Sequence, residues 1–244
     1  MRRLLVCLAL AGCARAGEQN SIIGGLNDAR PHSDADDVPP PDASTIDAPP
    51  QQVTLTQTAS NAITMNNSFG CVVGGSTLKN SYYRVFTLAS FNVTTVLHVQ
   101  KVEFGIQTAA AGGGAATQPA TVNLGTYGAV PTGTMLDLSL VRSLGSVPIQ
   151  IPNGSATSMS VPITGDVAPT TSVIVELAIP DGSAAGNKFF VGTNTDTERA
   201  PGYTLGPDCG VTPPTSMQSI ADDLGFGQVH MVMSVTGSTL DTPN

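Results

Sequence analysis

Oxygen-bearing side chains recur at alternate positions in one polar stretch of the sequence. Asn194, Asp196 and Glu198 are separated by threonines, and Asp208 follows further along. Hard oxygen ligands gathered in a loop suit Ca²⁺, although this spacing matches no EF-hand loop. A solvated polar loop is the alternative, and the neighbouring Arg199 would compete with a cation for the carboxylates. The sequence therefore leaves calcium open as a cofactor, at a site made of Asn194, Asp196, Glu198 and Asp208.

Tyrosine side chains offer a second kind of chemistry, the stacking of sugar rings on an aromatic face. The chain has four Tyr and no Trp. Tyr82 and Tyr83 are adjacent on a predicted strand, so one should face the core and the other should face out. Tyr203 follows a Pro-Gly pair in an expected loop. Tyr82, Tyr83 and Tyr203 are therefore the candidate ligand contacts.

Histidines and paired carboxylates are the residues that would support acid–base catalysis. His98 and His230 lie on predicted strands, where a surface or locally hydrogen-bonded role is expected. Asp222 and Asp223 are adjacent, and neighbouring side chains on an extended chain point in opposite directions. We therefore predict no catalytic residue and no enzymatic activity, with a hydrolase of unrecognised type as the alternative.

The elements that must position these residues are β-strands. Only 11% of the residues are charged and glycine is abundant, which suits a turn-rich β protein. Apolar and polar residues alternate in several segments, and the segment 173–179 is apolar except for Glu176. This pattern predicts an all-β sandwich or jelly roll of about nine or ten strands, without a long amphipathic helix. The expected strands are 53–58, 81–88, 101–107, 121–124, 136–143, 147–151, 158–164, 173–179, 188–192 and 229–235.

Glycine and proline clusters separate these strands and predict the turns between them. The clusters are Gly112-Gly113-Gly114, Pro131-Thr132-Gly133, Pro152-Asn153-Gly154, Pro180-Asp181-Gly182 and Pro213-Pro214. Their frequency favours short strands joined by tight connections, which is typical of a sandwich.

The first thirteen residues have the composition of an export signal. Arg2 and Arg3 precede a short apolar stretch, which ends in Leu10-Ala11-Gly12-Cys13. The stretch is too short to span a bilayer and indicates a signal peptide over residues 1–12. Its last four residues resemble the bacterial lipobox, which implies that Cys13 is diacylated through its sulfur, becomes the new N-terminus and is N-acylated. An ordinary secretory signal with an incidental cysteine is the alternative.

Lipidation at Cys13 would decide where the protein resides. Two or more acyl chains, such as palmitate, give stable membrane anchoring. In the lipobox pattern, Ala14 after the cysteine permits sorting to the outer membrane. We therefore expect a lipid-anchored protein of the cell envelope, at the outer membrane or cell surface.

Residues 13–52 have the composition of an acidic, proline-rich, disordered tether. They hold six prolines, seven acidic residues and two arginines, and such a stretch cannot bury enough apolar surface to offset chain entropy. Acidic Pro/Ala segments after a lipobox resemble those of myxobacterial surface lipoproteins. The β-sandwich domain is then expected over residues 53–240. The net charge of −8 disfavours nucleic acid as a partner.

Cysteine usage agrees with export. Cys7 would leave with the signal peptide and Cys13 would carry lipid, so Cys71 and Cys209 remain. An even pair in an oxidising compartment predicts a disulfide. Two buried free thiols are the alternative.

Short motifs spread over residues 68–237 resemble an uncharacterised β-sandwich module of secreted and surface bacterial proteins. They are the segments 82–86, 102–106, 190–194, 201–203, 209–210 and 230–233. Because the module has no established activity, the resemblance implies no catalytic residue. We expect a non-catalytic envelope protein that binds or structures extracellular material, with a glycan or a protein as ligand. A carbohydrate-binding module, with or without calcium, is the alternative.

Overall fold

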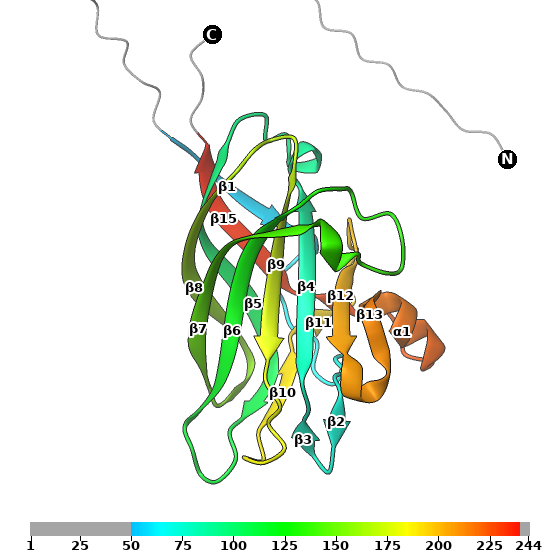
Figure 1. Ribbon diagram of the computed structural model, residues 1–244. Coiled ribbons are helices and arrows are strands. Elements are labelled where there is room, and N and C mark those ends of the chain that lie inside the picture. The colour runs from blue at the N-terminus through cyan, green and yellow to red at the C-terminus, as the bar shows by residue number, and fades with distance from the viewer. Residues whose placement is uncertain (1–49, 240–244) are drawn as a thin grey trace, which may run out of the picture. The chain divides into compact units, whose positions relative to one another are not determined.

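The computed structural model describes residues 50–239, which form a two-layered β-sandwich (Figure 1). The strands of the first sheet are β1 (Gln51–Thr56), β5 (Leu97–Ala110), β8 (Gly154–Val167), β10 (Lys188–Val191) and β15 (Met233–Thr239). Their order is β1-β15-β5-β10, with β8 also paired to β5. The predicted all-β sandwich is confirmed, whereas the predicted signal peptide, Cys13 and nearly all of the predicted tether lie outside the described residues.

The second sheet has six antiparallel strands and carries the site described below. Its strands are β4 (Asn80–Thr87), β6 (Thr117–Tyr127), β7 (Val141–Pro152), β9 (Ser172–Ile179), β12 (Gly202–Gly206) and β13 (Val211–Ser216). They run in the order β13-β12-β4-β9-β6-β7. β7 and β8 follow one another through Asn153 and belong to different sheets, β7 to the six-stranded sheet and β8 to the five-stranded one.

Short elements complete the fold. Two pairs of two-residue strands form, β2 (Val72–Val73) with β3 (Ser76–Thr77) and β11 (Thr193–Asn194) with β14 (His230–Met231). The helical segments are η1 (Leu88–Phe91), η2 (Leu138–Leu140), η3 (Pro207–Cys209) and α1 (Met217–Asp223). Within residues 50–239, no helix is long and apolar enough to cross a membrane.

The main core lies between the two sheets, where alternate residues of each strand face inward. Phe86, Phe104 and Leu177 are fully buried there, and each large apolar side chain removed from water stabilises the fold by about 1.5–3 kcal/mol. A second, smaller apolar cluster lies on the outer face of the six-stranded sheet. It consists of Tyr83, Val85, Tyr127, Leu136, Ile174 and Tyr203.

The connection between β6 and β7, residues 128–140, covers this second cluster, and we call it the strap. Figure 1 shows it passing in front of β9 and β4 toward β12 and β13. Leu136 N donates to Pro214 O at 2.9 Å, and Ser216 N donates to Thr134 O at 2.6 Å. The strap is therefore fixed to the edge strand β13 and forms a partial cover over the outer face of the sheet.

Several predicted boundaries differ from the structure. The strand expected at 136–143 is wrong in its first half, because residues 136–140 belong to the strap and β7 begins at Val141. The turn expected at Pro213-Pro214 is also wrong, since both prolines lie inside β13. Proline is tolerated there because β13 is an edge strand, where the missing N–H breaks no ladder in the sheet interior. The first strand begins at Gln51, inside the predicted tether.

The predicted disulfide between Cys71 and Cys209 is confirmed. It joins the segment before β2 to η3, with a sequence separation of 138 residues. In the chain-entropy description, closing a loop of this size destabilises the unfolded state by about 5 kcal/mol. The bond therefore fixes the connection between β12 and β13 to the segment that precedes β2.

Candidate functional site

The two adjacent tyrosines of β4 point to opposite faces of the six-stranded sheet, as a strand requires. Tyr82 faces the main core, is fully buried, and lies with its ring centroid 6.1 Å from that of Phe189. Tyr82 is therefore the core-facing tyrosine of the two, and its ring is covered by the opposite sheet. Tyr83 faces outward, toward the hollow described next.

Tyr83 is one of three polar side chains that lie side by side on neighbouring strands. Glu176 on β9 is the cross-strand partner of both Tyr83 on β4 and Asn123 on β6. The Tyr83 hydroxyl donates to Glu176 Oε1 at 2.8 Å, and Asn123 Nδ2 donates to Glu176 Oε2 at 2.8 Å. Each carboxylate oxygen is thus held by one neutral donor, which fixes the orientation of the carboxylate.

These three residues line a hollow of about 370 Å³ between the sheet and the strap. Leu138 of the strap forms one wall, and Val141 and Ile174 add further apolar surface. The remaining lining residues are Leu124, Gly125 and Ser143. A mostly apolar concavity with a few convergent polar groups is the usual composition of a small-ligand site.

The charge of the hollow is that of Glu176. No Lys, Arg or His nitrogen within residues 50–239 lies within ion-pair distance of its carboxylate. Burial, and next the charge of Glu176, raise the pKa of Tyr83 above its ordinary value. The Tyr83 hydroxyl therefore stays protonated and continues to donate to the carboxylate.

Tyr203 does not occupy the loop that the sequence predicts. It lies on β12 in the outer-face cluster, is fully buried, and its hydroxyl donates to Gly133 O of the strap at 3.2 Å. Burial, with smaller contributions from Tyr127 and Glu198, raises the pKa of Tyr203 to about 12. The loop position predicted for Tyr203 is thus wrong, and this buried tyrosine holds the strap on the sheet.

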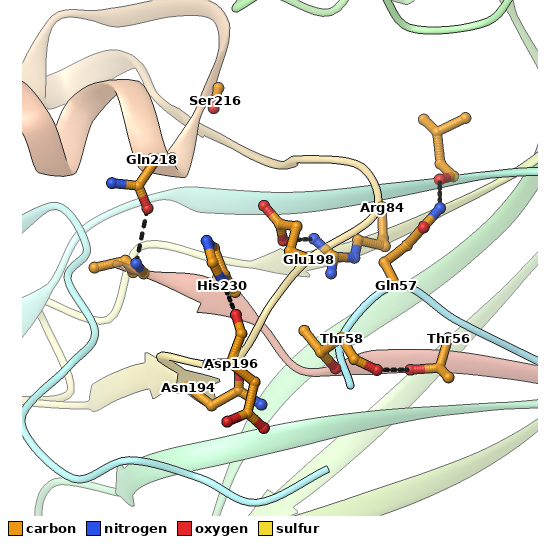
Figure 2. A network of polar contacts seen from close by, with 12 residues as sticks. Thr56, Gln57, Thr58, Arg84, Asn194, Asp196, Glu198, Ser216, Gln218 and His230 are labelled. Atoms are coloured by element: carbon orange, nitrogen blue, oxygen red, sulfur yellow. Dashed lines mark hydrogen bonds and ion pairs between the residues drawn. The ribbon is translucent and has the colours of Figure 1, made fainter. Parts of the chain in front are cut away.

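The residues predicted to bind calcium do not come together as one cage. Glu198 pairs with the guanidinium of Arg84 at 2.6 Å, and the Arg84 side chain is fully buried. Figure 2 shows Glu198 turned toward Arg84, apart from the carboxyl group of Asp196. A buried cation of the protein itself therefore neutralises the carboxylate that the sequence offered to calcium.

The other three predicted ligands have separate surroundings. The Asn194 amide donates to Ser60 O at 3.0 Å and to Ala62 O at 3.2 Å. The Asp196 carboxylate accepts from the Ser60 hydroxyl, and Nδ1 of His230 contacts the Asp196 carbonyl oxygen (Figure 2). Asp208 is exposed in η3. Across residues 50–239, no group of three His, Cys, Asp or Glu is placed to hold a metal ion.

The residues considered for acid–base chemistry also lie in separate places. Asp222 and Asp223 belong to the short helix α1, not to an extended segment, and Asp222 accepts from Gln218 Nε2 at 2.7 Å. His98 pairs with Asp166 at 2.8 Å on the five-stranded sheet, where the Asp166 side chain is largely exposed. These groups do not converge with one another or with Glu176 in the hollow.

Two residues of the hollow, Asn123 and Glu176, were not predicted as site residues. The one available signal was Glu176 itself, because a carboxylate in the middle of an apolar strand needs polar neighbours. Its partners come from β4 and β6, which are distant from β9 along the chain. Only the strand order of the sheet brings the three together.

Comparisons with known proteins add little. No family model matches the chain, and no curated protein matches it. Among solved structures, one similarity is to the cysteine protease and lectin-like domains of Cwp84, a surface layer associated protein of Clostridium difficile. It has a TM-score of 0.38 and 14% identity, and covers 72% of this chain and 37% of that chain. This chain thus spans little more than a third of that structure, and a similarity at this level says nothing about ligand or activity.

Proposed function

We propose that this protein is a lipid-anchored component of the cell envelope whose β-sandwich is a non-catalytic, carbohydrate-binding module. The observation that carries the binding role is the hollow on the outer face of the six-stranded sheet. There the Glu176 carboxylate is held by Tyr83 and Asn123 at 2.8 Å each, beside apolar side chains of the strap and sheet.

The chemistry of the hollow suits a hydroxyl-rich ligand. A carboxylate accepts hydrogen bonds from sugar hydroxyl groups. Because two donors already fix its orientation, less side-chain entropy is lost when a ligand binds. The apolar walls formed by Leu138, Val141 and Ile174 can cover the C–H faces of a sugar ring. Because Tyr83 is only 5% exposed, its part is to position Glu176 and form the floor, not to stack as an open platform.

A glycan array probed with the full domain tests this proposal. We expect binding to a defined subset of glycans that is lost or strongly reduced in Glu176→Gln. The matched control is Glu103→Gln, which changes a carboxylate on β5 of the opposite sheet that accepts from Ser158 at 3.1 Å. Binding that is equal in both variants and the unmodified protein, or no binding to any glycan, would contradict the proposed site.

A further inference from the structure

The Glu176 carboxylate is a partly buried charge without a counter-ion. The described residues contain three ion pairs, Arg84–Glu198, His98–Asp166 and Lys101–Glu103, and none includes Glu176. Asn123 and Tyr83 give it hydrogen bonds but no positive charge. Removing a carboxylate from water without a cation is costly unless a partner compensates it. The hollow therefore holds a negative charge with no cation of the described residues beside it.

The other lining residues restrict the charge of a ligand that fits the hollow. None of the nine lining residues is Lys, Arg or His, and the whole chain carries a net charge of −8. An anionic sugar would meet a like charge in the hollow and in the long-range field of the protein. A neutral sugar would satisfy hydrogen bonds and leave the charge uncompensated. A ligand bearing one positive charge fits both the local and the overall charge.

Combining this with the proposed function, on which the inference rests, we infer that the glycan recognised in the hollow carries a free amino group, as a hexosamine unit without its acetyl group does. The ammonium group lies against the two Glu176 oxygens and donates to the lone pairs that Tyr83 and Asn123 leave free. The Ser143 hydroxyl, which also lines the hollow, is available to a neighbouring sugar hydroxyl. The strap residue Leu138 covers the apolar side of the ring.

Three sugar tetramers with the same β-1,4 linkage separate the amino group from the rest of the glycan: glucosamine, N-acetylglucosamine and glucose. Binding is measured by calorimetry under mildly acidic conditions, where the amine is charged. We expect the glucosamine tetramer to bind about tenfold or more tightly than the other two, because only it forms a charge-assisted contact. Its affinity should fall as salt is added, while weak binding of the glucose tetramer should not.

Variants then assign the preference to Glu176. In Glu176→Gln the advantage of the glucosamine tetramer should disappear, while Glu103→Gln should keep it. Equal or tighter binding of the N-acetylated or glucose tetramer to the unmodified protein would overturn the inference and leave the proposed glycan binding intact. Failure of every glycan, in these titrations and on the array, would overturn both. The comparison of tetramers and the salt dependence need no variant, so a folding defect in Glu176→Gln would not obscure the outcome.

Discussion

Arg84 is a buried charge that holds a neighbouring segment of the chain in place. Its guanidinium lies inside the sandwich and is paired with Glu198, while Nε and Nη2 find no hydrogen-bond partner among the described residues. Burial lowers the pKa of Arg84, and the Glu198 charge opposes this effect. The pair thus fixes the segment that follows β11 to β4.

We predict that Glu198→Gln destabilises the domain by about 3–5 kcal/mol, because it leaves Arg84 buried without its counter-ion. Urea unfolding measures the loss. The double variant Arg84→Met with Glu198→Leu removes both charges and should recover most of the stability, since an apolar pair of similar size needs no desolvation of charge. A change of less than about 0.5 kcal/mol in Glu198→Gln would show that the pair is not the buried interaction described.

Tyr203 predicts a dependence of stability on alkaline pH. Its folded-state pKa of about 12 lies above the value of about 10 in an unfolded chain. The unfolded state therefore loses this proton first, and the stabilisation that is present below about pH 10 is lost as the pH rises toward 12. In Tyr203→Phe the free energy of unfolding should fall less steeply with pH over this interval. Urea denaturation at a series of pH values measures it. Identical slopes in the two proteins would argue against a buried, protonated Tyr203.

Single residues were predicted with uneven success. The opposite orientation of Tyr82 and Tyr83 follows from strand geometry alone, and the Cys71–Cys209 bond follows from the cysteine count. The predicted calcium ligands were grouped because they are close in sequence. The Glu198 carboxylate instead pairs with Arg84, which lies 114 residues away along the chain. A pairing at that distance leaves no local pattern in the sequence.

At the scale of elements, two strands, β10 and β15, meet end to end along one edge of β5. Along one edge of β5, β10 pairs with residues between Ile106 and Ala110, and β15 pairs with residues between Leu97 and Phe104. Between them Gly192 N donates to Gly105 O at 2.7 Å, and Val232 N donates to Gly192 O at 2.9 Å. A Cβ on Gly192 would lie only 2.6 Å from the Gly105 carbonyl carbon. The two strands can share this edge because residue 192 has no side chain.

We predict that Gly192→Ala destabilises the domain by about 1–3 kcal/mol or more, because backbone atoms must move apart to accept the methyl group. The matched control is Gly227→Ala, where an added Cβ would have no atom within 4 Å. Thermal unfolding of both variants gives the comparison. A Gly192→Ala protein as stable as Gly227→Ala would show that the junction is looser than its backbone distances indicate.

Element prediction succeeded where period-two alternation was strong and failed where it was weak. The strands β5, β6, β8 and β9 each contain their predicted segment. The short strand β12 and the proline-containing β13 were missed, because Gly202 and the pair Pro213-Pro214 indicate turns when read locally. The strap was partly predicted as a strand, since Leu136, Leu138 and Leu140 alternate. Leu136 belongs to the outer-face cluster and Leu138 lines the hollow, so these two leucines pack against the sheet without being part of it.

At the scale of the whole molecule, the proposed function requires a membrane anchor at Cys13 in addition to the binding domain. We predict that a bacterial host incorporates labelled palmitate into the unmodified protein and recovers it in the membrane fraction. Cys13→Ser should abolish both, because the acyl chains supply the membrane affinity. Cys7→Ser is the matched control and should keep both, since Cys7 lies within the predicted signal peptide. Recovery of an uncleaved, unlabelled chain from the cytosol would contradict the anchor.

Mapping by nuclear magnetic resonance tests most directly whether the outer face of the six-stranded sheet binds a glycan at Glu176. Titrating a labelled domain with the glucosamine tetramer should shift the amide signals of Asn123, Gly125 and Glu176, and the strap signal of Leu138. Signals from the outer face of the five-stranded sheet, such as that of Glu103, should stay in place. Shifts confined to the five-stranded sheet, or no shift with any of the three tetramers, would contradict the account.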